Sequence, residues 1–192
     1  MKNREYLTYN DYVEHQKKKT LLPSVQKIKA EKFKKRVLRF QKLFKVFEKR
    51  VDAGAKALCL GARRGEEVIA LNNMGYQATG VDLVAFPPYV IKGDFHNLPF
   101  ENKTFRIVYS NAVDHIFDLK KFADESFRVT KRKGYILFHL TLNIWSDEMS
   151  LGLQSSSEVI QHFKGVEVII DKKIKTFAGG LNHILCMKRV LK

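Results

Sequence analysis

Residues 56–83 read KALCLGARRGEEVIALNNMGYQATGVDL, and residues 90–100 continue with VIKGDFHNLPF. The pattern predicts a buried strand at 57–60, a glycine-bounded turn at 61–65, a helix at 66–74, and strands at 77–81 and 89–92. This order of elements is typical of α/β sheets that bind nucleosides at the carboxyl ends of their strands. Because Asp82 and Asp94 each follow a predicted strand, the segment predicts a nucleoside site.

The rest of the chain continues the alternation of strands and helices. Further strands are predicted at 105–110, 135–140, 166–170 and 183–187, and helices at 119–129 and 156–163. Such alternation predicts an α/β, Rossmann-like sheet of seven strands, mostly parallel, with helices on both faces. About a dozen residues without a strong helical pattern join the last two strands, so we expect these two strands to pair antiparallel at the sheet edge, with the last strand antiparallel.

A basic segment precedes this domain. Residues 1–22 are polar and lysine-rich and predict an irregular arm or a short helix, and an amphipathic helix is predicted from Ser24 to about Arg50. Large apolar residues recur on one face of that helix at Phe33, Val37, Phe40, Phe44 and Phe47. We expect this stripe to pack on the core, which divides the chain into a basic arm with its helix (1–52) and an α/β domain (53–192).

The positive charge is concentrated at the N-terminus. The net charge is +15, and residues 1–50 hold 16 Lys and Arg against 5 Asp and Glu. Such a segment can attract nucleic acid or an anionic surface, or it can simply form a solvated helix face. No run of about 18 apolar residues and no signal-like leader occurs, and the two cysteines lie in apolar runs. We therefore expect an intracellular protein, cytoplasmic rather than nuclear, without a disulfide framework, a metal site or a transmembrane segment.

The glycine turn excludes two common nucleotide motifs. Gly61 and Gly65 enclose Ala-Arg-Arg, which does not match the G-x-G-x-x-G of dinucleotide folds or the G-K-[ST] ending of a P-loop. An NAD-dependent oxidoreductase is therefore disfavoured. The turn suits a ligand whose charged end is an amino acid rather than a pyrophosphate.

Several segments in order resemble the class I S-adenosylmethionine-dependent methyltransferases, of the methyltransferase type 11-like kind. They are LCLGARRG, GVDL, GDFHNLPF, FRIVYSNAVDHIFD and RVTKRKGYILFHL, and the likeness covers about residues 55–192. The resemblance implies that the cofactor is S-adenosylmethionine, with S-adenosylhomocysteine as the product, and that a methyl group passes to an acceptor that the sequence does not identify.

The resemblance also implies residue roles. Asp82 would bind the ribose hydroxyls, and Asp94 the adenine amino group, beside Leu83 and Phe95. The remaining cofactor residues would be Gly61, Ala62, Arg63 and Gly65 of the turn, and Ser110 and Asn111 at the methionine end. Because His115 follows the fourth strand, it is either a catalytic base or a structural histidine. Trp145 and Met149 are candidate walls of the acceptor pocket.

Two departures from the family pattern leave a second function open. Cys59 stands where the family commonly has an acid, and Arg63 stands where it has the middle glycine. The Arg63 guanidinium can fold outward or pair with a carboxylate, including that of the cofactor. The alternative to an active methyltransferase is a catalytically inactive relative that binds nucleic acid or another partner.

Overall fold

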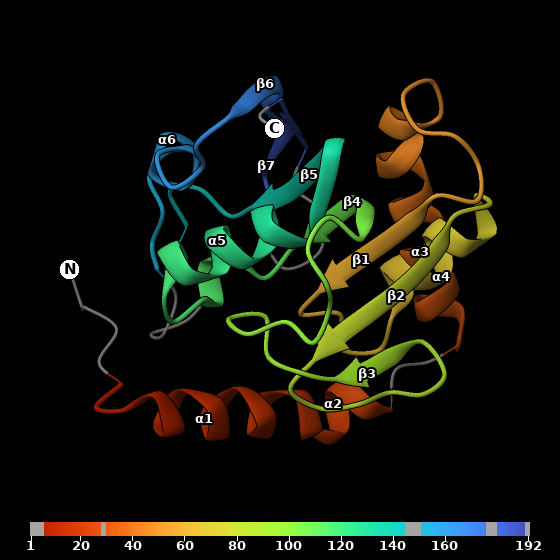
Figure 1. The fold of residues 1–192 in the computed structure, drawn as a ribbon. Helices are drawn as coiled ribbons and strands as arrows, with labels where there is room; N and C mark the ends of the chain where they lie inside the picture. The colour runs from red at the N-terminus through yellow and green to blue at the C-terminus, as the bar shows by residue number, and fades with distance from the viewer. Residues whose placement is uncertain (1–5, 28–29, 145–150, 176–179, 191–192) are drawn as a thin grey trace.

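The computed structural model describes residues 6–27, 30–144, 151–175 and 180–190. Its centre is a sheet in the order β3-β2-β1-β4-β5-β7-β6 (Figure 1). The strands are β1 (Lys56–Leu60), β2 (Gln77–Asp82), β3 (Val90–Lys92), β4 (Phe105–Ser110), β5 (Thr130–Leu140), β6 (Val166–Lys173) and β7 (His183–Arg189). Strands β1 to β5 pair in parallel, and β7 runs antiparallel to both β5 and β6. The predicted seven-stranded α/β sheet is confirmed.

Helices cover both faces of the sheet and the edge at which β1 and β2 end (Figure 1). They are α1 (Tyr9–Leu21), α2 (Pro23–Gln26), α3 (Ala30–Phe44), η1 (Lys45–Phe47), α4 (Glu66–Asn73), η2 (Val113–His115), α5 (Leu119–Val129) and α6 (Ser157–Ile160). The helix predicted from Ser24 to Arg50 is wrong as one continuous element, since the described part ends in the tighter turn η1. The helix predicted at 156–163 is also too long.

The hydrophobic core has two halves, one on each side of the sheet. On one side α5 contributes Phe122, Ala123 and Val129, which pack with apolar side chains of β4 and β5. On the other side the core is formed by α3, α4 and the opposite faces of the same strands. Burial on both sides is the reason why the central strands are apolar throughout rather than alternating.

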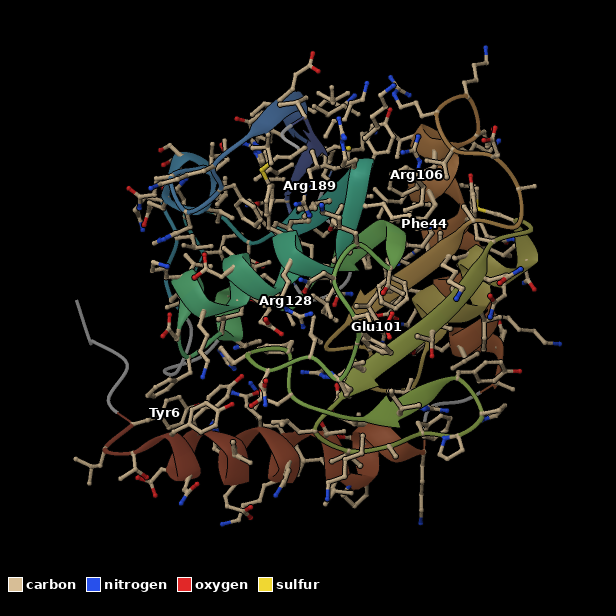
Figure 2. The ribbon with its side chains drawn as sticks, viewed as in Figure 1. Tyr6, Phe44, Glu101, Arg106, Arg128 and Arg189 are labelled. Carbon is tan, nitrogen blue, oxygen red and sulfur yellow. The ribbon has the colours of Figure 1, made fainter. Side chains whose placement is uncertain are left out.

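Helix α3 belongs to the second half of this core. Phe40, Phe44 and Phe47 are fully buried, and the Phe44 ring meets that of Tyr109 edge-on with centroids 4.9 Å apart. Figure 2 shows Phe44 between α3 and the sheet. The apolar stripe predicted from the sequence therefore shares a core with the strands, while the division of the chain at residue 52 stays a prediction.

Within the described ranges, none of the helices is both long and apolar enough to cross a bilayer.

Candidate functional site

The glycine turn joins β1 to α4 in a tight conformation. Gly61 has a φ of 69°, and a Cβ on it would lie 2.8 Å from the Cβ of Ala112, so only glycine fits there. Gly65 is also left-handed, with a φ of 78°, and is the N-cap of α4. Arg63 between them has a φ of 42°, which is uncommon for a residue with a side chain. The turn thus keeps the shape of a glycine turn even though arginine stands in its middle.

Asp82 is the last residue of β2, and its side chain holds the glycine turn through a hydrogen bond. Its Oδ2 accepts the backbone N–H of Arg63 at 2.9 Å, and its Oδ1 accepts that of Val84 at 3.2 Å. Burial raises the pKa of Asp82, although these N–H groups and the Arg63 charge oppose the rise. Each carboxylate oxygen has two lone-pair positions, so each can accept a further hydroxyl beside the backbone donor.

Asp94 lies after β3 and accepts a hydrogen bond from a side chain of the N-terminal helix α1. The phenol of Tyr9 donates to its Oδ2, while Oδ1 accepts the backbone N–H of His96 at 2.8 Å and lies 3.0 Å from that residue's Nδ1. Burial opposes ionisation of Asp94, but the bonds from His96 and Tyr9 outweigh it and lower its pKa to about 2. Asp94 is therefore an ionised acceptor, and Tyr9 uses part of its capacity.

The end of β4 supplies backbone to the same edge. Ser110 is fully buried, its Oγ donates to the carbonyl of Leu60 at 3.1 Å, and the N–H of Ala112 donates back to that Oγ at 3.2 Å. Ser110 thus ties β4 to β1 directly beneath the turn. Asn111 follows it and faces a cavity.

Two cavities lie at this edge of the sheet, and they share Gly61, Arg63, Ala112 and His115. The smaller, of about 40 Å³, is also lined by Tyr12, Gln16, Thr20, Asp82, Leu83 and Phe95. The larger, of about 480 Å³, is also lined by Lys32, Lys35, Arg36, Arg39, Ala62, Glu66, Glu67, Asn111, Asp114, Thr141 and Leu181. The shared residues make them neighbouring parts of one crevice.

Helix α1 narrows the smaller part. Thr8 and Asp11 form a capping box at its start, and Tyr12 is 1% exposed. The rings of Tyr9 and Tyr12 contact those of His96 and Phe117. A space of about 40 Å³ is far below the roughly 300–1000 Å³ of small-molecule sites. The side chains of α1 therefore occupy the volume beside Asp82 and Asp94.

Arg64, the second arginine of the turn, contacts the segment before the domain. Its guanidinium carbon lies 5.1 Å from the ring centre of Phe33 and 5.5 Å from that of Phe86, and one of its nitrogens donates to the carbonyl of Val25 at 3.2 Å. The cation–π contacts join α3 to the loop after β2, and the hydrogen bond joins α2 to the glycine turn. The two arginines thus have different surroundings, since Arg63 lines the cavities.

A buried carboxyl group forms part of the larger cavity. Glu67, on the first turn of α4, is 3% exposed, and burial together with the nearby Glu66 raises its pKa to about 8. The arginine closest to this acidic pair is Arg36, whose Nε lies 3.4 Å from Oε1 of Glu66. Glu67 therefore keeps its proton at neutral pH unless a cation enters the cavity.

Replacing Glu67 by glutamine should change how stability depends on pH. Unfolded Glu67 ionises near its ordinary pKa of 4.5, whereas folded Glu67 stays protonated to about pH 8. The folded state binds more protons in this window, so stability of the wild type falls as pH rises through it. Glutamine does not titrate, and we expect Glu67→Gln to gain on the order of 3–4 kcal/mol relative to wild type between pH 5 and pH 8. Urea unfolding of variant and wild type at pH 5 and at pH 8 measures this gain. The same difference in unfolding free energy between the two proteins at both pH values would contradict the prediction.

The crevice brings together most, though not all, of the residues expected from the sequence. Gly61, Ala62, Arg63, Asp82, Leu83, Phe95, Asn111 and His115 line one or both cavities. Both linings lack Gly65, Asp94 and Ser110. Gly65 is the N-cap of α4, Asp94 accepts a hydrogen bond from Tyr9, and Ser110 donates one to Leu60 of β1. The cofactor and catalytic roles of all these residues stay predictions. Trp145 and Met149 lie outside the described residues.

The sequence interpretation missed the contributions of α1 and Glu67. The Thr8-x-x-Asp11 capping pattern was a readable signal for a helix starting at Tyr9. Nothing local in the sequence indicated that Tyr9 would reach Asp94, 85 residues away. In the described part of the chain, no cluster of three or more potential metal ligands is found.

Residues 58–138 match a family model described as a methyltransferase domain. This part of the chain is similar to the methyltransferase domain family. The matched segment runs from β1 through most of β5 and includes the glycine turn, Asp82 and Asp94. No curated protein sequence matches the chain.

Several solved structures share the fold of this chain. A 1,6-didemethyltoxoflavin-N1-methyltransferase from Burkholderia thailandensis, solved with bound 1,6-didemethyltoxoflavin and S-adenosylhomocysteine, superposes with a TM-score of 0.72 at 12% identity, covering 98% of this chain and 93% of that one. The PH0226 protein of Pyrococcus horikoshii gives 0.69 at 17% identity, covering 91% and 99%. An S-adenosylmethionine-dependent methyltransferase from Aquifex aeolicus gives 0.64 at 17%, covering 85% and 100%. At these identities the likeness shows the fold.

The crevice has the chemistry that an S-adenosylmethionine nucleoside needs. Asp82 offers carboxylate oxygens, Leu83 and Phe95 offer apolar surface, and the bare Cα of Gly61 allows close approach of backbone. The space does not fit a nucleoside as it stands, because side chains of α1 leave a cavity of only about 40 Å³ beside Asp82.

Proposed function

We propose that this protein is an S-adenosylmethionine-dependent methyltransferase. The observation that carries the proposal is the position of Asp82, which ends β2, braces the glycine turn and lines the crevice with Leu83 and Phe95. The match to a methyltransferase domain supports it. S-adenosylmethionine, when bound, supplies a methyl group on a sulfonium sulfur that is already a good leaving group.

The residues of this chain would hold the cofactor along the crevice. Asp82 would accept bonds from the ribose hydroxyls, and Asp94, after Tyr9 releases it, from the adenine amino group. The methionine end would lie on Gly61, Ala62 and Asn111, at the floor of the larger cavity. Arg63, which lines both cavities, is placed to meet a carboxylate there.

Glu67 is our candidate for the ammonium group of the cofactor. The family commonly has an acid where Cys59 stands, and Cys59 is fully buried. Glu67 lines the same cavity as Gly61 and Asn111, and after burial its charge is the second cause that raises the pKa of the Cys59 thiol, so the two side chains lie near each other. A carboxyl group on α4 would then replace the one missing from β1. Because an ammonium would favour the ionised form, its entry should drive the Glu67 proton out.

His115 is the candidate base for an acceptor that must lose a proton. It lies at the junction of the two cavities, and its Nε2 is 3.8 Å from Oδ2 of Asp114, which is buried. The neighbouring carboxylate can orient the imidazole ring. His115 would thus receive the acceptor proton while the acceptor atom forms its bond to the methyl carbon.

Calorimetric titration of the full chain with S-adenosylhomocysteine and with S-adenosylmethionine tests the proposal. We expect a single site with a Kd in roughly the micromolar to submillimolar range, as enzymes bind their substrates. Folded protein that gives no heat with either compound at millimolar concentration would refute the proposal. It would leave the catalytically inactive binding protein as the better interpretation.

Removing the Tyr9 hydroxyl should strengthen cofactor binding. Tyr9 donates to the Asp94 oxygen that the adenine amino group would need, so the wild type must break this bond before the nucleoside enters. One such bond to a charged group is worth about 1.5 kcal/mol or more, so Tyr9→Phe should lower the Kd of S-adenosylhomocysteine roughly tenfold. Calorimetry measures the change. Tyr6→Phe, which removes a hydroxyl on the same segment that lies 2.6 Å from Nδ1 of His15, is the control and should leave the Kd within about twofold.

An unchanged Kd in Tyr9→Phe would show that α1 and the nucleoside do not compete for Asp94. A weaker affinity would show instead that Tyr9 is part of the bound state.

A further inference from the structure

The larger cavity has a cationic wall that the cofactor does not explain. Helix α3 contributes Lys32, Lys35, Arg36 and Arg39 to its lining, at spacings that place them on one face of the helix. The floor, by contrast, is formed by the glycine turn and the residues after β4. A volume of about 480 Å³ lies within the roughly 300–1000 Å³ typical of small-molecule sites.

The acidic residues of the lining do not balance this wall. Glu66 is engaged by Arg36, and burial keeps Glu67 protonated at neutral pH. Asp114 lies near His115 instead. Lys35 pairs with Glu31 at 2.5 Å, but both side chains are largely exposed, and such a pair contributes little. The cavity therefore presents an excess of positive charge to whatever enters it.

The wall also lies beside the place where methyl transfer would occur. His115 and Asn111 line the same cavity as Lys32 and Lys35. We propose that this cavity binds the methyl acceptor and that the acceptor is a small molecule carrying a carboxylate or phosphate group, which the α3 wall holds. This inference rests on the proposed function and names the substrate class of the same site.

The shape of the site favours a small anion over a nucleic acid. A polyanion would use the exposed lysines of α3 without regard to the cavity, since its electrostatic attraction depends mainly on the number of cations. Lys34 and Lys42 are exposed on the same helix and are absent from the cavity lining. They provide a matched control, because the two pairs of lysines have equal charge on one helix.

The experiment compares Lys32→Gln/Lys35→Gln with Lys34→Gln/Lys42→Gln in the full chain. Calorimetry at low ionic strength measures binding of two probes, malonate and inorganic phosphate, with and without saturating S-adenosylhomocysteine. We expect wild type to bind at least one probe in the presence of S-adenosylhomocysteine, which tells whether a carboxylate or a phosphate suits the wall better. The cavity variant should bind it roughly tenfold more weakly and the control variant within about twofold of wild type. Thermal unfolding checks that both variants fold.

Four results would overturn the inference. The first is that neither probe binds, and the second is that both variants lose the same affinity for the probe. The third is that S-adenosylhomocysteine displaces the probe. The fourth is that the small probes do not bind while a single-stranded oligonucleotide does, with its affinity lowered equally in both variants. Displacement would assign the wall to the carboxylate of the cofactor, and the oligonucleotide result would assign it to nucleic acid.

Failure of this inference is distinguishable from failure of the proposed function. Loss of probe binding with S-adenosylhomocysteine binding intact refutes the acceptor class alone. Absence of S-adenosylhomocysteine binding with probe binding intact refutes the methyltransferase proposal, and with it the assignment of the bound anion as a methyl acceptor.

Discussion

Replacing Phe44 by alanine is expected to lower the free energy of unfolding by about 3–5 kcal/mol. Phe44, the last residue of α3, is fully buried, and its ring contacts those of Phe40, Phe47 and Tyr109. Truncation removes these contacts and leaves a cavity between α3 and β4, which neighbouring rings cannot fill without leaving their own contacts. Chemical denaturation, followed by circular dichroism, measures the loss.

Leu38→Ala provides the matched control. Leu38 lies on the same helix, is 58% exposed, and should change the free energy of unfolding by less than about 0.5 kcal/mol. A comparably small effect of Phe44→Ala would mean that α3 is an appendage that can leave the domain without damage. A large effect would make the N-terminal helix an integral part of the folded unit.

Asp82→Asn is expected to weaken binding of S-adenosylhomocysteine about 100-fold, because hydrogen bonds to a charged group are worth about 1.5–3 kcal/mol each. The asparagine side chain keeps one acceptor oxygen, while its NH₂ faces a backbone N–H of Arg63 or Val84 that the carboxylate now accepts. The substitution therefore removes acceptors from the ribose and disturbs the glycine turn at once. Calorimetry with wild type and variant gives the ratio of Kd values.

Asp124→Asn serves as the control, because it removes the same negative charge from a position outside the crevice. Asp124 is exposed on α5, pairs with Lys120 at 2.6 Å, and should leave the Kd unchanged. If Asp82→Asn binds within about threefold of wild type, ribose recognition by Asp82 is refuted, since the loss of even one such bond exceeds that factor. If the unfolding temperature of Asp82→Asn is much lower than that of wild type, the loss of affinity comes from disruption of the glycine turn rather than from lost bonds to the ribose.

Much of the fold was predictable because burial on both faces leaves unbroken apolar strands. Strand β4 and helix α5 were predicted with the bounds that the structure has. Strand β5 begins five residues earlier than expected, at Thr130, because the basic residues 131–133 extend it beyond the buried part. Charged side chains on an exposed strand end give no apolar pattern, so periodicity cannot locate such an end.

The site was predictable only where its residues are tied to strand ends. The position of Asp82 follows from the end of β2, and that of Asn111 from the end of β4. The contacts of Tyr9 with Asp94 and of α3 with the cavity depend on how the N-terminal segment crosses the sheet, which no local pattern encodes. Glu67 looked like an ordinary acid in the first turn of a helix. Its surroundings include Arg36 of α3 and Tyr109 of β4, which are far away in the sequence.

The contacts of Arg64 bear on how this protein should be expressed. Its guanidinium lies against Phe33 and bonds the carbonyl of Val25, both of which precede the α/β domain. A fragment starting at residue 53 would leave this arginine without those partners and would also uncover the apolar surface that Phe40, Phe44 and Phe47 cover. We expect such a fragment to be recovered as aggregate, and a useful truncation to begin before Val25.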